Sequence, residues 1–323
     1  MKKGKCYEII ASTADIPKEK WLGIRREGIG GSDAAAIAGL SKWSTPFSVW
    51  TDKIGELPAR EETEAMRQGK DLEQYVAQRF ELATGRKVKR LNAVIRSKVQ
   101  PFMQANVDRM VVGENAGLEC KTTSSLNLKR FAGGEFPDEY YAQCVHYMAV
   151  TGADRWYLAV LVLGRDFLTF TIDRDEKEIE ALIKAEKAFW ETYVVPRVAP
   201  PVDGKEPTTD AIKTIYADSR EDAEVADLFP LQDRAEKYFE LQAVIKTLQA
   251  QQEEIKQAMM AQMGEAEIGF AGKYKAIWKS QTRTTYDMKR LAEDHPEINI
   301  KDYAKTSTSR PFSLKEMAQS KED

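Results

Sequence analysis

The sequence predicts an α/β fold in which helices flank a central mixed sheet, followed by a helical C-terminal arm and a small α+β tail. Three observations support this prediction. Helical spacing of apolar residues over residues 61–84 gives way to three strand-like segments between residues 92 and 122. A helix, two strands and another helix are then expected over residues 138–194. Beyond four prolines between residues 196 and 207, the pattern becomes helical again.

The N-terminal elements are short. Residues 17–57 predict a helix, a glycine-rich turn and two further helices. Ser32 follows two glycines and precedes an alanine-rich run, which is typical of a residue that caps a helix N-terminus. Asp33 comes next and would interact favourably with the positive end of that helix's dipole.

The sheet is expected to follow the helix that Gly85 ends. Its first strands are predicted at residues 92–96, 104–112 and 117–122. The turns between them contain Gln100-Pro101 and Gly113-Glu114-Asn115. The remaining elements are a helix over 138–151, strands over 155–163 and 167–172, and a helix over 175–194.

Three parts of the chain are expected: a core at 1–197, a linker region at 198–229, and the arm and tail at 230–323. Within the arm, apolar residues over 230–263 follow the 3-4-3 spacing of a coiled coil, and Gln252 fills one seam position. The tail predicts short strands at 273–280 and 310–314 and a helix near 287–294.

Composition excludes several classes of protein. No apolar run approaches the roughly 20 residues that span a bilayer, and the N-terminus has no long apolar segment typical of a signal peptide, so no membrane partner is expected. Three cysteines without a Cys-x-x-Cys spacing argue against a disulfide framework and a zinc site, and favour a cytoplasmic location. Only two histidines are present, so metal chemistry here should use carboxylates, which suit magnesium or manganese.

Charge is informative only locally. The net charge of −3 predicts no polyanionic partner, but residues 86–98 carry six basic side chains and no acidic one. That segment is either a solvated strand edge or a strip that faces phosphates.

Asp108, Glu119 and Lys121 form the strongest local feature. Glu119 and Lys121 lie two apart in one predicted strand and therefore point to the same face. The tight turn before that strand brings Asp108 close to both. Two carboxylates can hold a divalent cation against a phosphate, and the lysine can orient or deprotonate a water, so this set suits phosphodiester hydrolysis. The bare acid-x-lysine pattern recurs elsewhere in the chain; the strand context and Asp108 distinguish this copy.

Other candidates allow two interpretations. Glu73 is either an exposed helix residue or an additional acid of the site. Gln143 either braces the lysine or substrate or is a satisfied core amide. His146 is interpreted as structural or peripheral. The side chain of Cys120 should point into the core, opposite to its neighbours, while its backbone carbonyl remains available as a ligand.

These residues resemble the PD-(D/E)XK nucleases, which have a restriction-endonuclease-like fold. The chain is most similar to the YqaJ-type viral recombinase, or lambda-exonuclease-like, family. Four segments between residues 21 and 152 carry the resemblance, in order: WLGIRREGIGGSDAAAIAGLSKWSTPFSVWTDKIG, QGKDLEQYVAQRFELATG, PFMQANVDRMVVGENAGLECKT and YYAQCVHYMAVTG.

The resemblance implies a role for each matching residue. Asp108, Glu119, Glu73 and the carbonyl of Cys120 would hold Mg²⁺, with Mn²⁺ as a substitute. Lys121 would activate the water. Gln143 matches the family's glutamine on the following helix. Arg25 and Ser32 match the residues that bind a 5′-phosphate, in keeping with the free N–H groups of a helix N-terminus.

The implied activity is 5′-to-3′ digestion of one strand of linear double-stranded DNA, which releases mononucleotides and leaves a 3′ overhang. A single-strand annealing protein would bind that overhang during phage-type recombination in the bacterial cytoplasm. The family's short members form trimeric rings, so a homo-oligomer is expected, although the long C-terminal arm departs from those members. Two alternatives stay open: an endonuclease or repair nuclease of the same fold, and a non-catalytic DNA-binding or assembly protein.

Overall fold

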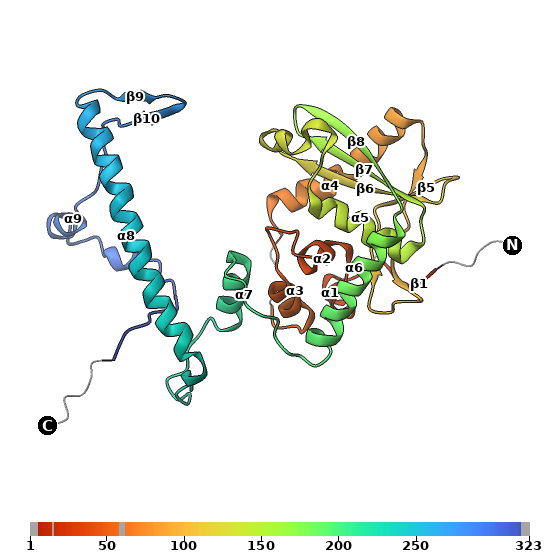
Figure 1. Cartoon of the computed structure of the whole chain (residues 1–323), viewed down its shortest axis with the longest axis horizontal. Coiled ribbons are helices and arrows are strands. Elements are labelled where there is room, and N and C mark those ends of the chain that lie inside the picture. Colours follow the sequence, from red (N-terminus) through yellow and green to blue (C-terminus); the bar gives the residue numbers. More distant parts are fainter. Residues whose placement is uncertain (1–5, 15, 58–61, 318–323) are drawn as a thin grey trace. The chain divides into compact units, whose positions relative to one another are not determined.

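The computed structural model describes residues 6–14, 16–57 and 62–317 and divides the chain into two compact units, Met1–Tyr216 and Ala217–Asp323 (Figure 1). The first unit is a mixed α/β structure, as predicted. Within the described residues, no helix combines the length and apolar character needed to cross a membrane.

A five-stranded sheet forms the centre of the first unit. Its strands run in the order β2 (Val88–Lys89), β5 (Arg109–Val111), β6 (Ala116–Thr123), β7 (Arg155–Val162) and β8 (Asp166–Asp173). β6 and β7 are parallel and the other neighbours are antiparallel, so the sheet is mixed. Gly117 on β6 lets the indole of Trp156 lie against the backbone, because a Cβ there would be 2.2 Å from the ring.

Two long helices cover opposite faces of this sheet. Helix α4 (Glu64–Thr84) packs Val76 and Phe80 against the face that carries Leu118, and α5 (Asp138–Thr151) packs on the other face. Burying a valine or phenylalanine completely contributes roughly 1.5–3 kcal/mol, which fixes these helices to the sheet. α4 ends, as predicted, at Gly85 and α5 ends at Gly152; both glycines have positive φ, 72° and 69°.

A second, smaller sheet differs from the sequence prediction. Strand β3 (Ala93–Ser97) does not join the central sheet but pairs with β1 (Tyr7–Ser12) and β4 (Gln104–Ala105). The strand expected over 104–112 is therefore divided into β4 and β5, and Asp108 lies in the break between them. The strand is divided because its two parts pair with different strands: β4 pairs with β3, whereas β5 pairs with β6.

The three short N-terminal helices are present as predicted: α1 (Lys18–Arg26), α2 (Gly31–Ile37) and α3 (Pro46–Lys53). The 3₁₀ segment η1 (Ser125–Gly134) follows β6 in sequence. Helix α6 (Glu176–Phe189) follows β8 and continues as a π-helical turn, η2 (Trp190–Val194). The first unit extends past the predicted boundary at residue 197, because α7 (Glu206–Ile215) buries Ala211 beside α3.

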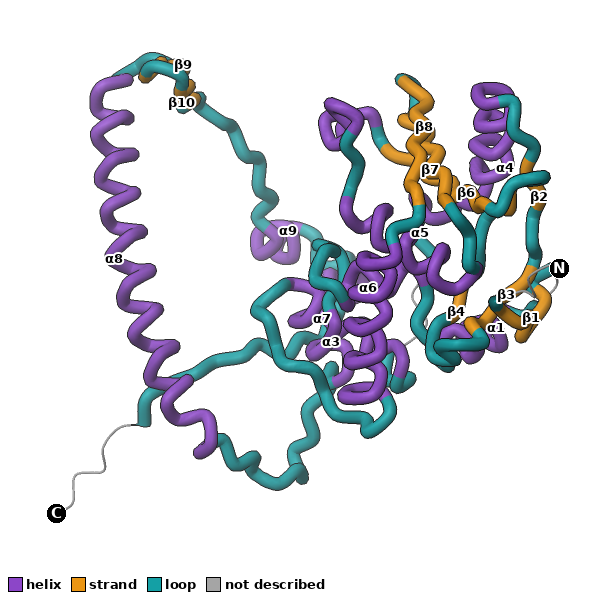
Figure 2. The backbone as a smooth tube through the Cα atoms, turned by 45° about the vertical axis from the view of Figure 1, so that its right-hand side comes forward, coloured by secondary structure: helices purple, strands orange, loops and turns teal. Residues whose placement is uncertain are grey.

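The second unit contains the long helix α8 (Gln232–Met263), after the short 3₁₀ turn η3 (Phe229–Leu231) (Figure 2). A hairpin of β9 (Ile268–Ala271) and β10 (Tyr274–Ile277), helix α9 (Met288–Asp294) and a 3₁₀ turn, η4 (Ile300–Tyr303), follow. The helices expected over 230–263 and near 287–294 are present as α8 and α9, and the strand expected at 273–280 is present as β10. The strand expected at 310–314 is wrong: residues 310–314 form neither helix nor strand in the structure.

Candidate active site

The β5–β6 hairpin brings Asp108 to Glu119. Arg109 pairs with Leu118 across the two antiparallel strands, so the residue before Arg109 lies opposite the residue after Leu118. The Oδ2 atom of Asp108 accepts a hydrogen bond of 2.8 Å from the backbone N–H of Cys120. The backbone of β6 thereby fixes the carboxylate of Asp108 beside that of Glu119.

Lys121 is held between a carboxylate and an amide. Its Nζ lies 2.6 Å from Oε1 of Glu119 and donates a hydrogen bond of 2.9 Å to Oε1 of Gln143. Gln143 in turn donates to the hydroxyl of Tyr147 over 2.8 Å, which fixes the orientation of the amide. The ring of Tyr140 lies 5.3 Å from the ammonium group and offers it a cation–π contact. Strand β6 and helix α5 therefore position the amine together.

The site holds more buried negative charge than Lys121 can satisfy. Glu119 is only 2% exposed, and its Oε2 atom is buried without a hydrogen-bond partner among the residues that the structure describes. Burial raises the pKa of Asp108 well above its usual value, and the neighbouring carboxylates of Glu119 and Glu73 raise it further. Burial would lower the pKa of Lys121, but Glu119 and Asp108 outweigh it and raise the pKa. These carboxylates would be stabilised by a further cation.

Glu73 lies close enough to Asp108 to raise the pKa of that carboxyl, and its role as an additional acid of the site stays a prediction. Glu73 belongs to α4, which covers the sheet face opposite to Glu119, and its carboxylate binds the guanidinium of Arg109. Arg109 also donates to the backbone oxygen of Asp108. Among the described residues, no three His, Cys, Asp or Glu side chains are gathered closely enough to hold a metal ion.

The side chain of Cys120 points, as expected, to the face opposite to Glu119. It is half-buried against the cluster of α4.

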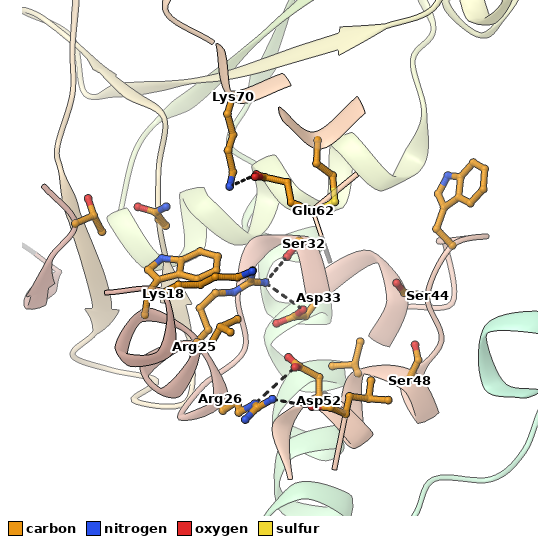
Figure 3. A pocket seen from close by; sticks show the side chains of 18 of the residues that line it. Lys18, Arg25, Arg26, Ser32, Asp33, Ser44, Ser48, Asp52, Glu62 and Lys70 are labelled. Atoms are coloured by element: carbon orange, nitrogen blue, oxygen red, sulfur yellow. Dashed lines mark hydrogen bonds and ion pairs between the residues drawn. The ribbon is translucent and has the colours of Figure 1, made fainter. Parts of the chain in front are cut away.

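Arg25 and Ser32 meet at the start of α2. Nη2 of Arg25 donates to Oγ of Ser32 over 3.1 Å (Figure 3). The ring of Trp21 lies 4.8 Å from the guanidinium carbon of Arg25. Ser32 is not the N-cap: the helix begins at Gly31, after Gly30. Oδ2 of Asp33 accepts from the N–H of Gly30 over 2.9 Å and performs the capping that was expected of Ser32. The hydroxyl of Ser32 therefore does not cap the helix and instead accepts a hydrogen bond from Arg25.

Sequence reasoning missed the role of Lys53. Its completely buried side chain reaches from α3 to Oδ2 of Asp33 over 2.7 Å and donates to the backbone oxygen of Arg25 over 3.0 Å. Burial would raise the pKa of Asp33, but Lys53 and Arg25 lower it. Lys53 is the closer cation to Asp33, whereas Nη2 of Arg25 makes only a longer contact of 4.0 Å with Oδ1 of Asp33. Lys53 is the last residue of a helix in which half of the residues are polar, so its position in the sequence gave no distinctive signal.

Gly31 brings α2 against α5. A Cβ at this position would lie 2.5 Å from the ring of Tyr147 and 3.0 Å from Cγ of Gln143. The absence of a side chain therefore places the Arg25–Ser32 pair next to the helix that holds Lys121.

One cavity of about 1470 Å³ in the first unit extends from the Arg25–Ser32 pair to Asp108. Its lining includes Arg25, Ser32, Glu73 and Asp108, whereas Glu119 and Lys121 are not part of it. Arg90, from the basic segment over 86–98, also lines it. Other members of that segment pair with carboxylates, namely Arg86 with Glu114, Lys87 with Glu81 and Arg96 with Glu27. Arg90 itself lies 3.9 Å from Oε1 of Glu73, so the phosphate-facing interpretation of the segment stays a prediction, supported by the place of Arg90 in the cavity.

His146 is structural, as expected. It is fully buried, with Nδ1 2.7 Å from Oε1 of Glu186 and Nε2 2.8 Å from the backbone oxygen of Gln104. These contacts join α5 to α6 and β4, the strand that precedes Asp108.

Comparison with known proteins gives one extended match. The sequence model of the YqaJ-like viral recombinase domain matches residues 20–154. The uncharacterized protein YqaJ of Bacillus subtilis (strain 168) is 38% identical over 317 residues, which cover 97% of this chain and 99% of that protein.

Two solved structures are more distantly similar. The alkaline exonuclease LHK-Exo of Laribacter hongkongensis has a TM-score of 0.45 at 21% identity, covering 55% of this chain and 94% of its own. A phage-related exonuclease from Haemophilus somnus 129PT has a TM-score of 0.41 at 15% identity, covering 55% and 99%.

Proposed function

Since the chain belongs to the YqaJ-like viral recombinase family, we propose that it is a metal-dependent exonuclease that digests one strand of linear double-stranded DNA from its 5′ end. It would release mononucleotides and leave a 3′ overhang for a single-strand annealing protein. One observation carries the proposal: the buried carboxylates of Asp108 and Glu119 meet a lysine that Gln143 holds in place, beside a cavity into which Asp108 opens.

The donor set fits a hard divalent cation such as Mg²⁺, with Mn²⁺ as a substitute. In the described part of the chain, Oε2 of Glu119 has no hydrogen-bond partner, and burial and neighbouring carboxylates disfavour the ionised form of Asp108. Carboxylate and carbonyl oxygens are the ligands that such cations prefer, so Asp108, Glu119 and the carbonyl of Cys120 would hold the ion. When bound, it would polarise the phosphodiester and stabilise negative charge on its oxygens. Glu73 binds Arg109 through Oε1, so it would join the ion through Oε2.

The remaining steps belong to the protein's own side chains. Lys121 would orient the attacking water and offset the negative charge that develops on the phosphate. Glu119 and Gln143 would keep the amine in position for each round of cleavage. Arg25 and Ser32 would hold the terminal 5′-phosphate in the same cavity, which favours an end over an internal site.

A comparison of DNA topologies tests the proposal. Linear duplex and covalently closed circular duplex of the same sequence are incubated with the protein and Mg²⁺, and acid-soluble nucleotides are measured. We expect release from the linear form alone. Cleavage of the closed circle would show an endonuclease instead, and binding of both forms without any cleavage would show a non-catalytic DNA-binding protein.

A further inference from the structure

Within the second unit, helix α8 carries a row of large apolar side chains that no other described element of that unit buries. Of the residues described in the second unit, none is buried. We define the α8 seam as the positions that follow the 3-4 spacing: Tyr238, Leu241, Ile245, Leu248, Gln252, Ile255 and Met259. Leu248 is 57% exposed and Ile255 is 59% exposed. Six apolar side chains on one row of a 32-residue helix require a partner surface.

We propose that the α8 seam pairs with the α8 seam of a second copy of this chain, as a parallel, in-register coiled coil. The spacing is that of alternating a and d positions, in which side chains of one helix enter holes of the other. Each copy supplies the same row, so the contact is self-complementary. This inference concerns assembly and does not depend on the proposed nuclease activity.

Gln252 decides the direction of the two helices. In a parallel, in-register pair, Gln252 meets Gln252 of the second copy, and the two amides can hydrogen-bond to each other. In an antiparallel pair that superposes the same apolar rows, Gln252 would face Leu241 and bury an amide without a partner. A polar residue at one seam position is a known means of specifying register and number of helices.

The residues that flank the seam favour the same arrangement. In the parallel pair, Lys237 would lie beside Gln242 of the second copy, and Lys256 beside Gln251 of the second copy, so each ammonium meets an amide oxygen. In the antiparallel pair, the same lysines would face alanines. Each lysine also forms an ion pair within its own helix, Lys237 with Glu240 at 2.7 Å and Lys256 with Glu253 at 3.1 Å. Repulsion between the lysines of the two copies is therefore small.

Sedimentation of the full-length protein tests whether the seam is used. The wild type should sediment as an assembly of the 36.6 kDa chain, and Leu241→Asp/Leu248→Asp should weaken self-association by at least about 100-fold, because it places charges in the apolar contact. Ala243→Asp/Ala250→Asp is the matched control, with the same spacing and charge on the outer face of α8. A monomeric wild type, or an assembly that the Leu241→Asp/Leu248→Asp variant leaves unchanged, would overturn the proposal.

Two further variants keep the test independent of misfolding. Gln252→Leu should tighten self-association by about tenfold or more, since it replaces a polar seam residue, and a poorly folded variant would not show a concentration-dependent gain. Gln252→Cys should form a disulfide between two copies under mild oxidation, whereas Gln257→Cys on the outer face should not exceed the wild type. Failure of Gln252→Cys to cross-link would exclude the parallel, in-register arrangement.

Discussion

Lys121 and Gln143 are joined by a hydrogen bond of 2.9 Å between Nζ and Oε1, although one lies on β6 and the other on α5. We expect Gln143→Leu to lower kcat by about 10-fold to 100-fold and to leave KM nearly unchanged, because the amine loses its fixed position but the DNA contacts remain. Gln143→Glu keeps an acceptor and should retain more activity. Steady-state rates on linear duplex measure both, and a loss confined to KM would contradict this role.

We expect the carboxylate of Asp108 to destabilise the fold when no cation is bound. Its pKa is raised by burial and by Glu119 and Glu73, so its ionised form weakens the fold at neutral pH. Asp108→Asn keeps an acceptor for the N–H of Cys120 and removes the charge. In the presence of EDTA, we expect it to raise Tm by about 2–4 °C, equivalent to about 1 kcal/mol, while abolishing Mg²⁺-supported cleavage. A lower Tm in EDTA would show that the carboxylate is satisfied without a cation.

Arg25 should discriminate between DNA ends. Arg25→Ala removes the guanidinium beside Ser32 and should reduce kcat/KM on 5′-phosphorylated duplex by about 10-fold or more, and on 5′-hydroxyl duplex much less. Arg26→Ala is the control, because Arg26 lines the same cavity but binds the carbonyl of Leu57. Equal losses on both substrates for Arg25→Ala would remove the phosphate assignment.

His146 should make stability depend on pH. Burial would lower its pKa, but the carboxylate of Glu186 and two hydrogen bonds outweigh it and raise the pKa. Since the folded pKa lies above the unfolded value of about 6.5, this contribution is fully present below that pH and is lost as pH rises through the folded pKa. We expect Tm to fall between pH 6.5 and pH 9 by more in the wild type and in the exposed-site control His295→Gln than in His146→Gln. An equal fall in all three would exclude His146 as the source.

The sequence was sufficient for features that depend on short spacing. The two-residue period of a strand placed Glu119 and Lys121 on one face, and the turn at residue 113 brought Asp108 to them. Helical spacing and glycine stops likewise gave α4 and α5 nearly to their ends.

Features that depend on distant pairing were not predictable. Nothing near residue 93 in sequence indicates that β3 pairs with β1, or that the strand after it changes partner at Asp108. Glu73 lies on the predicted helix, but a helical wheel does not show that Arg109, 36 residues later, reaches its carboxylate first. Lys53 and Asp33 were missed for the same reason: the contact exists only once three helices are packed together.

End-labelled linear duplex with 5′-phosphates gives the most direct test of the central claim, that Asp108, Glu119 and Lys121 form the centre of a 5′-end exonuclease. With Mg²⁺, we predict that a 5′ label is released as mononucleotide in the first turnovers, while a 3′ label stays on long strands. EDTA or Lys121→Ala should abolish release, with DNA binding retained. Early release of the 3′ label, or undiminished digestion by Lys121→Ala, would contradict the account.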